Sequence, residues 1–211
     1  MVDMHCHILP GVDDGAKSIK EARQMLEIAQ NGGIRTIIAT PHYRGRYRDR
    51  AAQFQAYTQL RPEAAERGIE LLFGCEFHYA EFEAEDVPNY RERFCLSNTN
   101  RLLFELGAHT LFADVEEWIY CMQRHGLEII LAHPERNAEF QSSRRIVDRY
   151  AEIGCRFQVS ADALLHSPLS AVRRTANYLI RRNQCDYVAS DAHSPEDYEQ
   201  FLTVLRKLNR E

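Results

Sequence analysis

The first residues of the chain carry two histidines whose spacing suits metal binding. His5 and His7 alternate with Met4 and Cys6, and Asp3 precedes them. Successive side chains of a β-strand point to opposite faces, so both imidazoles should project from one face. Buried histidines need partners, and a divalent metal is the commonest partner for two neutral imidazoles. The alternative is a pair of core histidines that are satisfied by backbone groups.

Further histidines and carboxylates follow other short apolar segments. Asp14 lies in an Asp-Asp-Gly turn after the first segment, and six more residues sit at or just past the end of a predicted strand: His42, Glu76, Glu105, His133, Asp191 and His193. The C-terminal ends of parallel strands meet at one edge, where active sites are built. Imidazoles and carboxylates are the ligand set of divalent transition metals, and so many acids would repel one another without cations. We therefore expect a multi-metal cluster that activates water.

Arginines supply the candidate phosphate contacts. Arg136 lies three residues past His133, where a guanidinium could hold a phosphate. The alternating arginines of the 44–50 segment are more typical of a solvated loop than of a substrate clamp. The histidines in loops or at helix ends have no predicted role: His78, His109, His125 and His166.

The elements that must position these residues follow a β-α rhythm, which is typical of a parallel sheet. The predicted strands are 2–7, 36–40, 70–77, 101–106, 128–132, 155–159 and 187–190. The first helix is capped by Ser18 and ends at Gly32 and Gly33, and the later helices are 51–67, 111–125, 143–153, 168–183 and 195–208. Pro62 should kink or split the second helix. Residues 79–99 read as a long active-site loop or an irregular helix.

Composition narrows the class of protein. The chain has 211 residues, 45% hydrophobic and 27% charged, which fits one compact α/β domain. A net charge of -5 gives no argument for nucleic-acid or membrane binding. The six scattered cysteines, with no Cys-x-x-Cys, are predicted to be reduced and buried. With no signal peptide and no apolar run that would span a bilayer, we expect a cytoplasmic protein.

Seven segments in order carry a resemblance that covers nearly the whole chain. They are Asp3-Met4-His5-Cys6-His7-Ile8, Val12-Asp13-Asp14-Gly15, Thr36-Ile37-Ile38-Ala39-Thr40-Pro41-His42, Gly74-Cys75-Glu76, Phe104-Glu105-Leu106, Ala132-His133-Pro134-Glu135-Arg136 and Ala189-Ser190-Asp191-Ala192-His193. These segments resemble the PHP (polymerase and histidinol phosphatase) superfamily. The resemblance is closest to the manganese-dependent bacterial protein-tyrosine phosphatases of capsule and exopolysaccharide operons, the CpsB/YwqE type.

The resemblance implies a single domain over residues 1–211, a distorted (β/α)7 TIM-like barrel, with three Mn²⁺ ions, although Fe, Zn, Mg or Co would also suit such ligands. It places His5, His7, Glu76 and Asp191 on one ion and Asp14, His42, Glu105, His133 and His193 on the others. Arg136 would bind phosphoryl oxygens, and Asp14 or His42 would relay a proton to the leaving tyrosinate. The implied substrate is phosphotyrosine on the tail of a membrane-associated tyrosine kinase that controls polysaccharide export.

One departure and three alternatives accompany this resemblance. Family members often carry a second arginine after the final Asp-x-His, where this chain has Ser194–Tyr198, so phosphate binding rests on Arg136 with help from the 44–50 loop.

A histidinol-phosphatase-like small-molecule phosphoesterase is the first alternative. An amidohydrolase with a carboxylated lysine is disfavoured, because none of the three lysines falls on a predicted strand. A catalytically inactive module that docks on the kinase is the third. No Cys-x5-Arg loop supports a thiolate mechanism, and the oligomeric state stays open.

Overall fold

A computed structural model describes residues 1–208. The chain forms two compact units, of which the first comprises residues 1–75 and those from 189 onward, and the second comprises residues 76–188. The expectation of a single domain over residues 1–211 stays a prediction.

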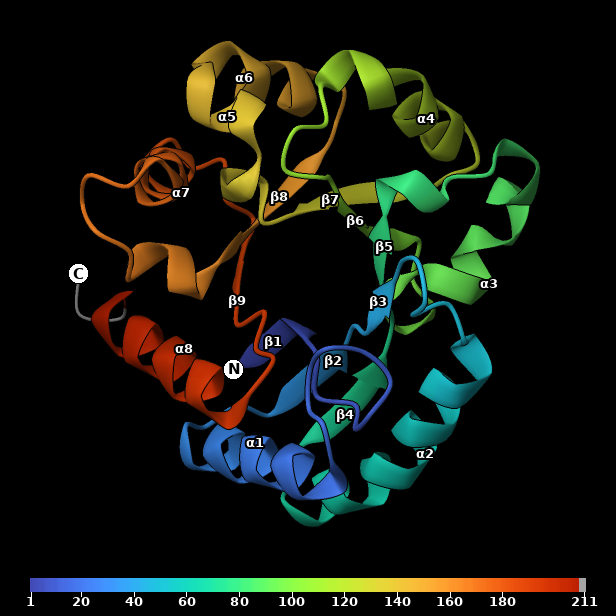
Figure 1. The fold of residues 1–211 in the computed structure, drawn as a ribbon, viewed down its shortest axis with the longest axis vertical. Coiled ribbons are helices and arrows are strands. Elements are labelled where there is room, and N and C mark those ends of the chain that lie inside the picture. Colours follow the sequence, from blue (N-terminus) through green and yellow to red (C-terminus); the bar gives the residue numbers. More distant parts are fainter. Residues whose placement is uncertain (209–211) are drawn as a thin grey trace. The chain divides into compact units, whose positions relative to one another are not determined.

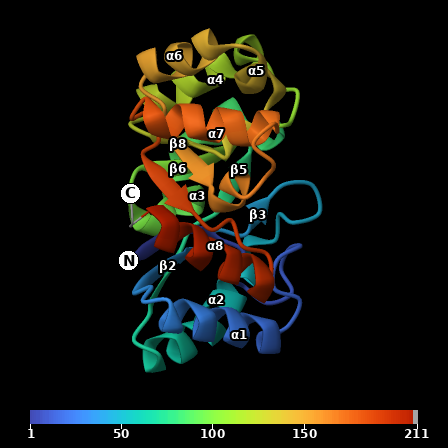
Figure 2. The ribbon, with the colours of Figure 1, turned by 90° about the vertical axis from the view of Figure 1, so that its left-hand side faces the viewer.

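The first unit contains a three-stranded parallel sheet. Its strands lie in the order β1 (Val2–Cys6), β2 (Thr36–Ala39) and β4 (Glu70–Phe73). The helices of this unit are α1 (Ile19–Asn31), α2 (Arg50–Glu66) and α8 (Pro195–Leu208). In both views α8 lies beside α1 (Figures 1 and 2). The first and the last helix of the described chain therefore belong to the same unit.

The first helix begins where the sequence predicts. The side chain of Ser18 accepts a hydrogen bond from the backbone N–H of Glu21, at 3.3 Å, which satisfies one of the free donors at the helix start. The buried stripe of α1 consists of Ala22, Met25, Leu26 and Ala29, at the spacing of one helix face. This stripe packs toward the core of the first unit.

The second unit is built on a further parallel sheet. Its strands follow in the order β5 (Glu76–His78), β6 (Arg101–Glu105), β7 (Glu128–Ala132), β8 (Arg156–Ser160) and β9 (Tyr187–Ala189). The helices are α3 (Tyr90–Phe94), α4 (Phe112–Arg124), α5 (Ala138–Ser142), α6 (Arg144–Glu152) and α7 (Ala171–Arg181), with α4 packed on β7 and α7 on β8 (Figure 1). Fully buried Leu102, Leu103, Ile129 and Ile130 form the middle of this sheet, as continuous apolar strands predict.

The predicted strand 70–77 is wrong in one respect, because it is two strands that belong to different sheets. β4 ends at Phe73 and pairs with β2, whereas β5 starts at Glu76 and pairs with β6. Between them the backbone of Gly74 donates to the carbonyl of Ala39 (2.9 Å) and accepts from Arg50 Nη1 (3.1 Å). These bonds hold the connection while the chain leaves the first sheet.

Other boundaries differ locally. Pro62 was expected to kink or split the second helix, and the split is wrong, because α2 continues through Pro62 as one element. Residues 79–99 form an irregular helical segment of three 3₁₀ turns and α3, broken where Ser97 and Asn98 have positive φ. A short strand, β3 (His42–Tyr43), was not predicted.

The overall class is a mixed α/β fold with parallel sheets. All six cysteines are free, and no helix among residues 1–208 combines the length and apolarity needed to cross a bilayer.

Candidate metal centre

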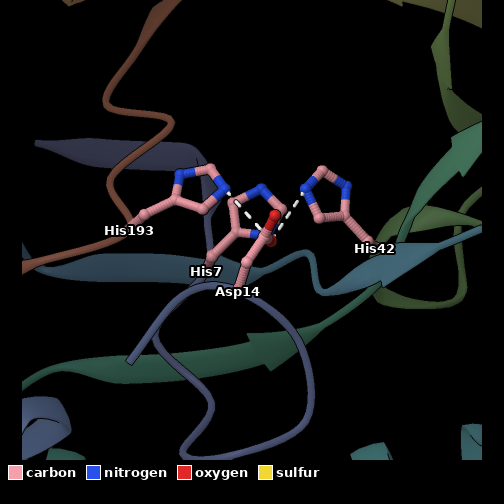
Figure 3. Close-up of side chains that lie close together, drawn as sticks. All are labelled: His7, Asp14, His42 and His193. Atoms are coloured by element: carbon pink, nitrogen blue, oxygen red, sulfur yellow. Dashed lines mark ion pairs between the residues drawn. The ribbon is translucent and has the colours of Figure 1, made fainter. Parts of the chain in front are cut away.

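Four side chains of the first unit gather around one point. His7 follows β1, Asp14 lies in the next turn, His42 begins β3, and His193 follows β9; one ligand atom from each lies within 4.8 Å of the others. Figure 3 shows the three imidazoles around the Asp14 carboxylate. Asp14 Oδ1 is 3.2 Å from His42 Nε2 and 3.6 Å from His193 Nε2. Hydrogen bonding to His42 is the main cause that lowers the pKa of Asp14 well below its usual range, so this carboxylate is ionised.

Asp191, His5 of β1 and His7, which follows β1, form an adjoining group. Both imidazoles project from one face, as the strand pattern predicts, and their Nε2 atoms are 3.1 Å apart. Asp191 Oδ1 lies 3.3 Å from His5 Nε2 and 3.4 Å from His7 Nε2. All three residues are buried. The arrangement brings a carboxylate and two imidazoles together away from water.

The spacing of these donors fits a divalent metal. Ligands bound at about 2.1 Å in tetrahedral or octahedral geometry lie about 3.0–3.4 Å from one another, and the donor pairs here are separated by 3.1–3.6 Å. When His7 is neutral and donates from Nδ1 to Asp13, the lone pair of its Nε2 faces Asp191 Oδ1. Two acceptors that face each other in a buried site are stabilised by a cation between or beside them.

Asp13, to which the sequence analysis gave no role, lies behind His7. Its Oδ2 accepts from His7 Nδ1 (2.8 Å) and from the backbone N–H of His42 (3.0 Å), and its Oδ1 accepts from the N–H of Gly15 (2.9 Å). Burial acts to raise the pKa of Asp13, but His7 and these hydrogen bonds outweigh it and lower the pKa. A carboxylate behind a ligating histidine fixes the ring orientation. The available signal was the pair of adjacent aspartates in the turn.

Gly15 completes this turn because no larger residue fits. A Cβ at this position would lie 2.1 Å from the carbonyl oxygen of His7. The glycine therefore lets the turn press against the backbone of His7 while Asp13 holds its ring.

Asp13→Asn is expected to weaken Mn²⁺ binding by about tenfold or more, because the amide removes the negative charge and one acceptor behind His7. Isothermal titration calorimetry of the metal-free protein measures this change. Asp49→Asn, at the cap of α2, is the matched control. An Asp13→Asn protein that binds Mn²⁺ as tightly as the wild type would contradict the role of Asp13.

The second unit holds the other predicted ligands. Glu76 begins β5 and is fully buried, and its Oε1 lies 2.7 Å from His133 Nε2. Glu105 ends β6 and is paired in register with Ala132, the last residue of β7. Glu105 lies at the C-terminal end of its strand, as the sequence analysis expects, whereas Glu76 begins β5, because the predicted strand 70–77 is divided in two.

Two candidate ligands have strained backbones. His133 has a φ of 31° and Asp191 a φ of 50°, in the left-handed region that non-glycine residues rarely adopt. His133 directly follows β7, and Asp191 lies two residues past the end of β9. Such strain persists where surrounding structure holds it, and it concentrates at functional sites.

Arg136 ends the 3₁₀ turn Pro134–Arg136 that follows His133. Its Nη2 donates to Ser160 Oγ (3.3 Å) and to Asp162 Oδ1 (3.2 Å), and 41% of its side chain is exposed. These two contacts orient the guanidinium but leave part of it accessible. A guanidinium presented in this way can bind an anion.

Glu135 is a second residue that the sequence did not mark. Its side chain is fully buried, and its Oε1 accepts from the backbone N–H of Ser160 at 2.8 Å. Burial raises the pKa of Glu135 to about 7, against the opposing effects of His133 and Arg136. The bond from Ser160 joins the turn that carries Arg136 to the end of β8.

Glu135→Gln is expected to remove a pH-dependent loss of stability in the metal-free protein. The folded pKa of Glu135 is raised, so its favourable contribution is present below the unfolded pKa of 4.5 and is lost as the pH rises through about 7. The difference in unfolding free energy between variant and wild type should grow by about 3 kcal/mol between about pH 5 and about pH 8. Urea unfolding at the two pH values measures it; parallel pH dependence in both proteins would contradict the assignment.

A polar pocket of about 310 Å³ lies beside the first cluster. Asp14 and His193 line it together with Lys17, Glu21 and Glu196. The centre in the first unit is therefore reachable by a small charged group.

The fold and these clusters define the class as an α/β protein with a candidate metal centre at the ends of parallel strands. A family model described as capsular polysaccharide synthesis, CpsB/CapC, matches residues 1–203. The chain belongs to this family.

Similar proteins agree with this membership. The chain is 34% identical to the tyrosine-protein phosphatase YwqE of Bacillus subtilis, over 98% of this chain and 84% of that protein. It is 26% identical to the tyrosine-protein phosphatase CpsB of Streptococcus agalactiae, over 99% and 89%. Among solved structures, one reported with YwqE from Bacillus subtilis and CpsB from Streptococcus pneumoniae as metal-dependent tyrosine phosphatases matches with a TM-score of 0.82 at 29% identity, covering 98% of this chain and 87% of that one.

Proposed function

We propose that this chain is a metal-dependent protein-tyrosine phosphatase. The observation that carries the proposal is the cluster of His7, Asp14, His42 and His193, whose spacing fits a divalent metal. The cluster occurs in a chain that is 34% identical over 98% of its length to a tyrosine-protein phosphatase.

The proposed centre holds three Mn²⁺ ions. His5, His7, Glu76 and Asp191 bind one of them, and the others are bound by Asp14, His42, Glu105, His133 and His193. The proposal includes a distorted (β/α)7 barrel, in which the ends of all strands contribute to one mouth. Fully buried Glu76, whose Oε1 lies 2.7 Å from His133 Nε2, supports a cation-filled site, because a carboxylate and an imidazole held together are a ligand pair for divalent transition metals.

The chemistry proposed is direct hydrolysis of the phosphate ester. Bound divalent ions would supply water of lowered pKa and neutralise phosphoryl charge. Arg136 binds a phosphoryl oxygen, and its contacts with Ser160 and Asp162 support this role by orienting the guanidinium. Asp14 or His42 would relay the proton lost by the attacking water to the leaving tyrosinate, and the exposure of 44% of the Asp14 side chain supports its contact with substrate.

The proposed substrate is a phosphotyrosine protein in the cytoplasm. Within the family's capsular polysaccharide synthesis role, the fitting partner is the tail of a membrane-associated tyrosine kinase. A flexible tail suits this role, because it can deliver phosphotyrosine to a site on a separate protein.

A substrate comparison tests the proposal. The Mn²⁺-loaded protein is assayed with a phosphotyrosine peptide and with histidinol phosphate, and the assay is repeated after dialysis against a chelator. We expect peptide hydrolysis at a higher kcat/KM than for histidinol phosphate, and its loss without metal. A preference for histidinol phosphate would favour a small-molecule phosphoesterase, and full activity in chelator would contradict the metal centre.

A further inference from the structure

One arginine of the 44–50 loop touches the first metal cluster. Arg44 Nη2 lies 3.0 Å from His42 Nε2 and 3.4 Å from Asp14 Oδ2. His42 and Asp14 also contact each other, because His42 Nε2 lies 3.2 Å from Asp14 Oδ1. The guanidinium therefore places a positive charge against a nitrogen and a carboxylate that are both proposed metal ligands.

The neighbouring arginines have other contacts. Arg50 Nη1 donates to the carbonyl of Gly74, and its guanidinium lies over the ring of Phe73 at 4.3 Å. Arg46 donates to the hydroxyl of Tyr47 at 2.7 Å. Arg50 thus supports the loop from behind, whereas Arg46 contacts an aromatic ring beside the centre.

The loop is held at both ends, and the Arg44 side chain between them is partly exposed. Gln53 Nε2 donates to the carbonyls of His42 (2.9 Å) and Tyr47 (3.0 Å), which fixes the backbone on both sides. Gly45 has a φ of 49°, and nothing lies within 4 Å of the position its Cβ would take. About a third of the Arg44 side chain is exposed, at 34%. A small anion can therefore reach the guanidinium from solvent.

We propose that Arg44 has two roles at this centre: it takes the place of a cation at His42 and Asp14 when metal is absent, and it binds a phosphoryl oxygen of the substrate when metal is present. This inference rests on the proposed phosphatase function. A metal bound to His42 Nε2 would occupy the lone pair of this nitrogen, which could then neither donate to Asp14 nor accept from Arg44. Metal binding therefore ends the contact between His42 and Arg44, and repulsion between the two positive charges moves the guanidinium toward an incoming anion.

The chemistry of arginine fits the second role. Its planar guanidinium presents parallel N–H donors that match two oxygens of a phosphate, and it keeps its charge at any physiological pH. Arg44 lies beside Asp14, which lines the pocket next to the centre. A phosphate that reached the ligands of the first cluster would lie within reach of this side chain.

The test measures two affinities in Arg44→Ala, with Arg46→Ala as the matched control from the same loop. Titration calorimetry gives Mn²⁺ binding to the metal-free protein and inorganic phosphate binding to the Mn²⁺-loaded protein. Arg44→Ala should bind Mn²⁺ about threefold to tenfold more tightly, because a competing cation is removed. It should bind phosphate about tenfold more weakly, because a charged bidentate partner is lost. Arg46→Ala should change neither affinity by more than about twofold.

In Arg44→Ala the affinity for Mn²⁺ should rise while the affinity for phosphate falls. These opposite changes distinguish the proposed role of Arg44 from a structural one. If Arg44 only supported the loop, both affinities would fall together in Arg44→Ala, and the inference would be overturned. Unchanged affinities, or equal shifts in Arg46→Ala, would overturn it too. Arg44→Lys keeps the positive charge but lacks the parallel N–H donors of the guanidinium. This variant should therefore bind Mn²⁺ as tightly as the wild type does and bind phosphate more weakly.

Neither measurement requires turnover. Opposite shifts in a protein that hydrolyses no phosphotyrosine would therefore support Arg44 and overturn only the proposed function. Normal hydrolysis with unchanged affinities would overturn the Arg44 roles alone. A wild-type protein that binds no Mn²⁺ would overturn both.

Discussion

His7→Ala is expected to lower kcat/KM for a phosphotyrosine peptide by on the order of 10³-fold, the largest effect of any single substitution in this chain. His7 belongs to the cluster with Asp14, His42 and His193, and its Nε2 also lies 3.4 Å from Asp191 Oδ1. Its removal therefore takes a donor from two groups of ligands at once. Activity assays with added Mn²⁺ and elemental analysis of bound metal measure the effect.

The matched control for His7 is His109→Ala. His109 is exposed in the loop before α4 and has no predicted role, so activity and metal content should both stay at the wild-type level. Circular dichroism of His7→Ala checks that the fold is retained. A folded His7→Ala protein with full activity and full metal content would refute the centre.

Arg136→Ala is expected to lower kcat/KM by about 10²-fold to 10³-fold while leaving the amount of bound metal unchanged. The partly exposed guanidinium is oriented by Ser160 and Asp162, and we propose that it neutralises charge on the phosphoryl oxygens as the ester bond breaks. Arg136→Lys should recover only part of the activity, because an ammonium lacks the planar fork. Steady-state kinetics and elemental analysis separate this effect from metal loss.

Arg145→Ala serves as the control for Arg136. Arg145 is exposed near the start of α6, so its removal should leave both kcat and KM within about twofold of the wild type. An Arg136→Ala protein with normal kcat/KM would remove this residue from the proposed mechanism. A loss of bound metal in that variant would assign Arg136 a structural role instead.

Most elements could be predicted from the sequence because their apolar patterns are local. The helix Pro195–Leu208 has the predicted bounds, and the strand Glu128–Ala132 is also as predicted. The division of 70–77 into β4 and β5 could not be seen in this way. The residues of both strands are apolar or candidate ligands, so their types do not show where one strand ends and the other begins. Only the pairing of β4 with β2 and of β5 with β6 distinguishes the two strands. Strand pairing is a long-range property that local propensity does not contain.

The candidate ligands were predictable for a related reason. Histidines and acids at the ends of apolar strands are costly unless something binds them, so their types and positions alone indicated a metal centre. The geometry of the first unit agrees, since His5 and His7 project from one face beside Asp191.

The sequence by itself determined the kinds of donor atom available to this protein and the strand ends that carry them, because residue type and periodicity are written locally. Only the tertiary structure decided which other charges stand behind or beside those donors. Asp13 supports His7, Glu135 joins its turn to Ser160, and Arg44 meets His42 and Asp14. These roles depend on which loop folds against which strand, and a charged residue in a loop looks the same in sequence whether it faces water or a buried imidazole.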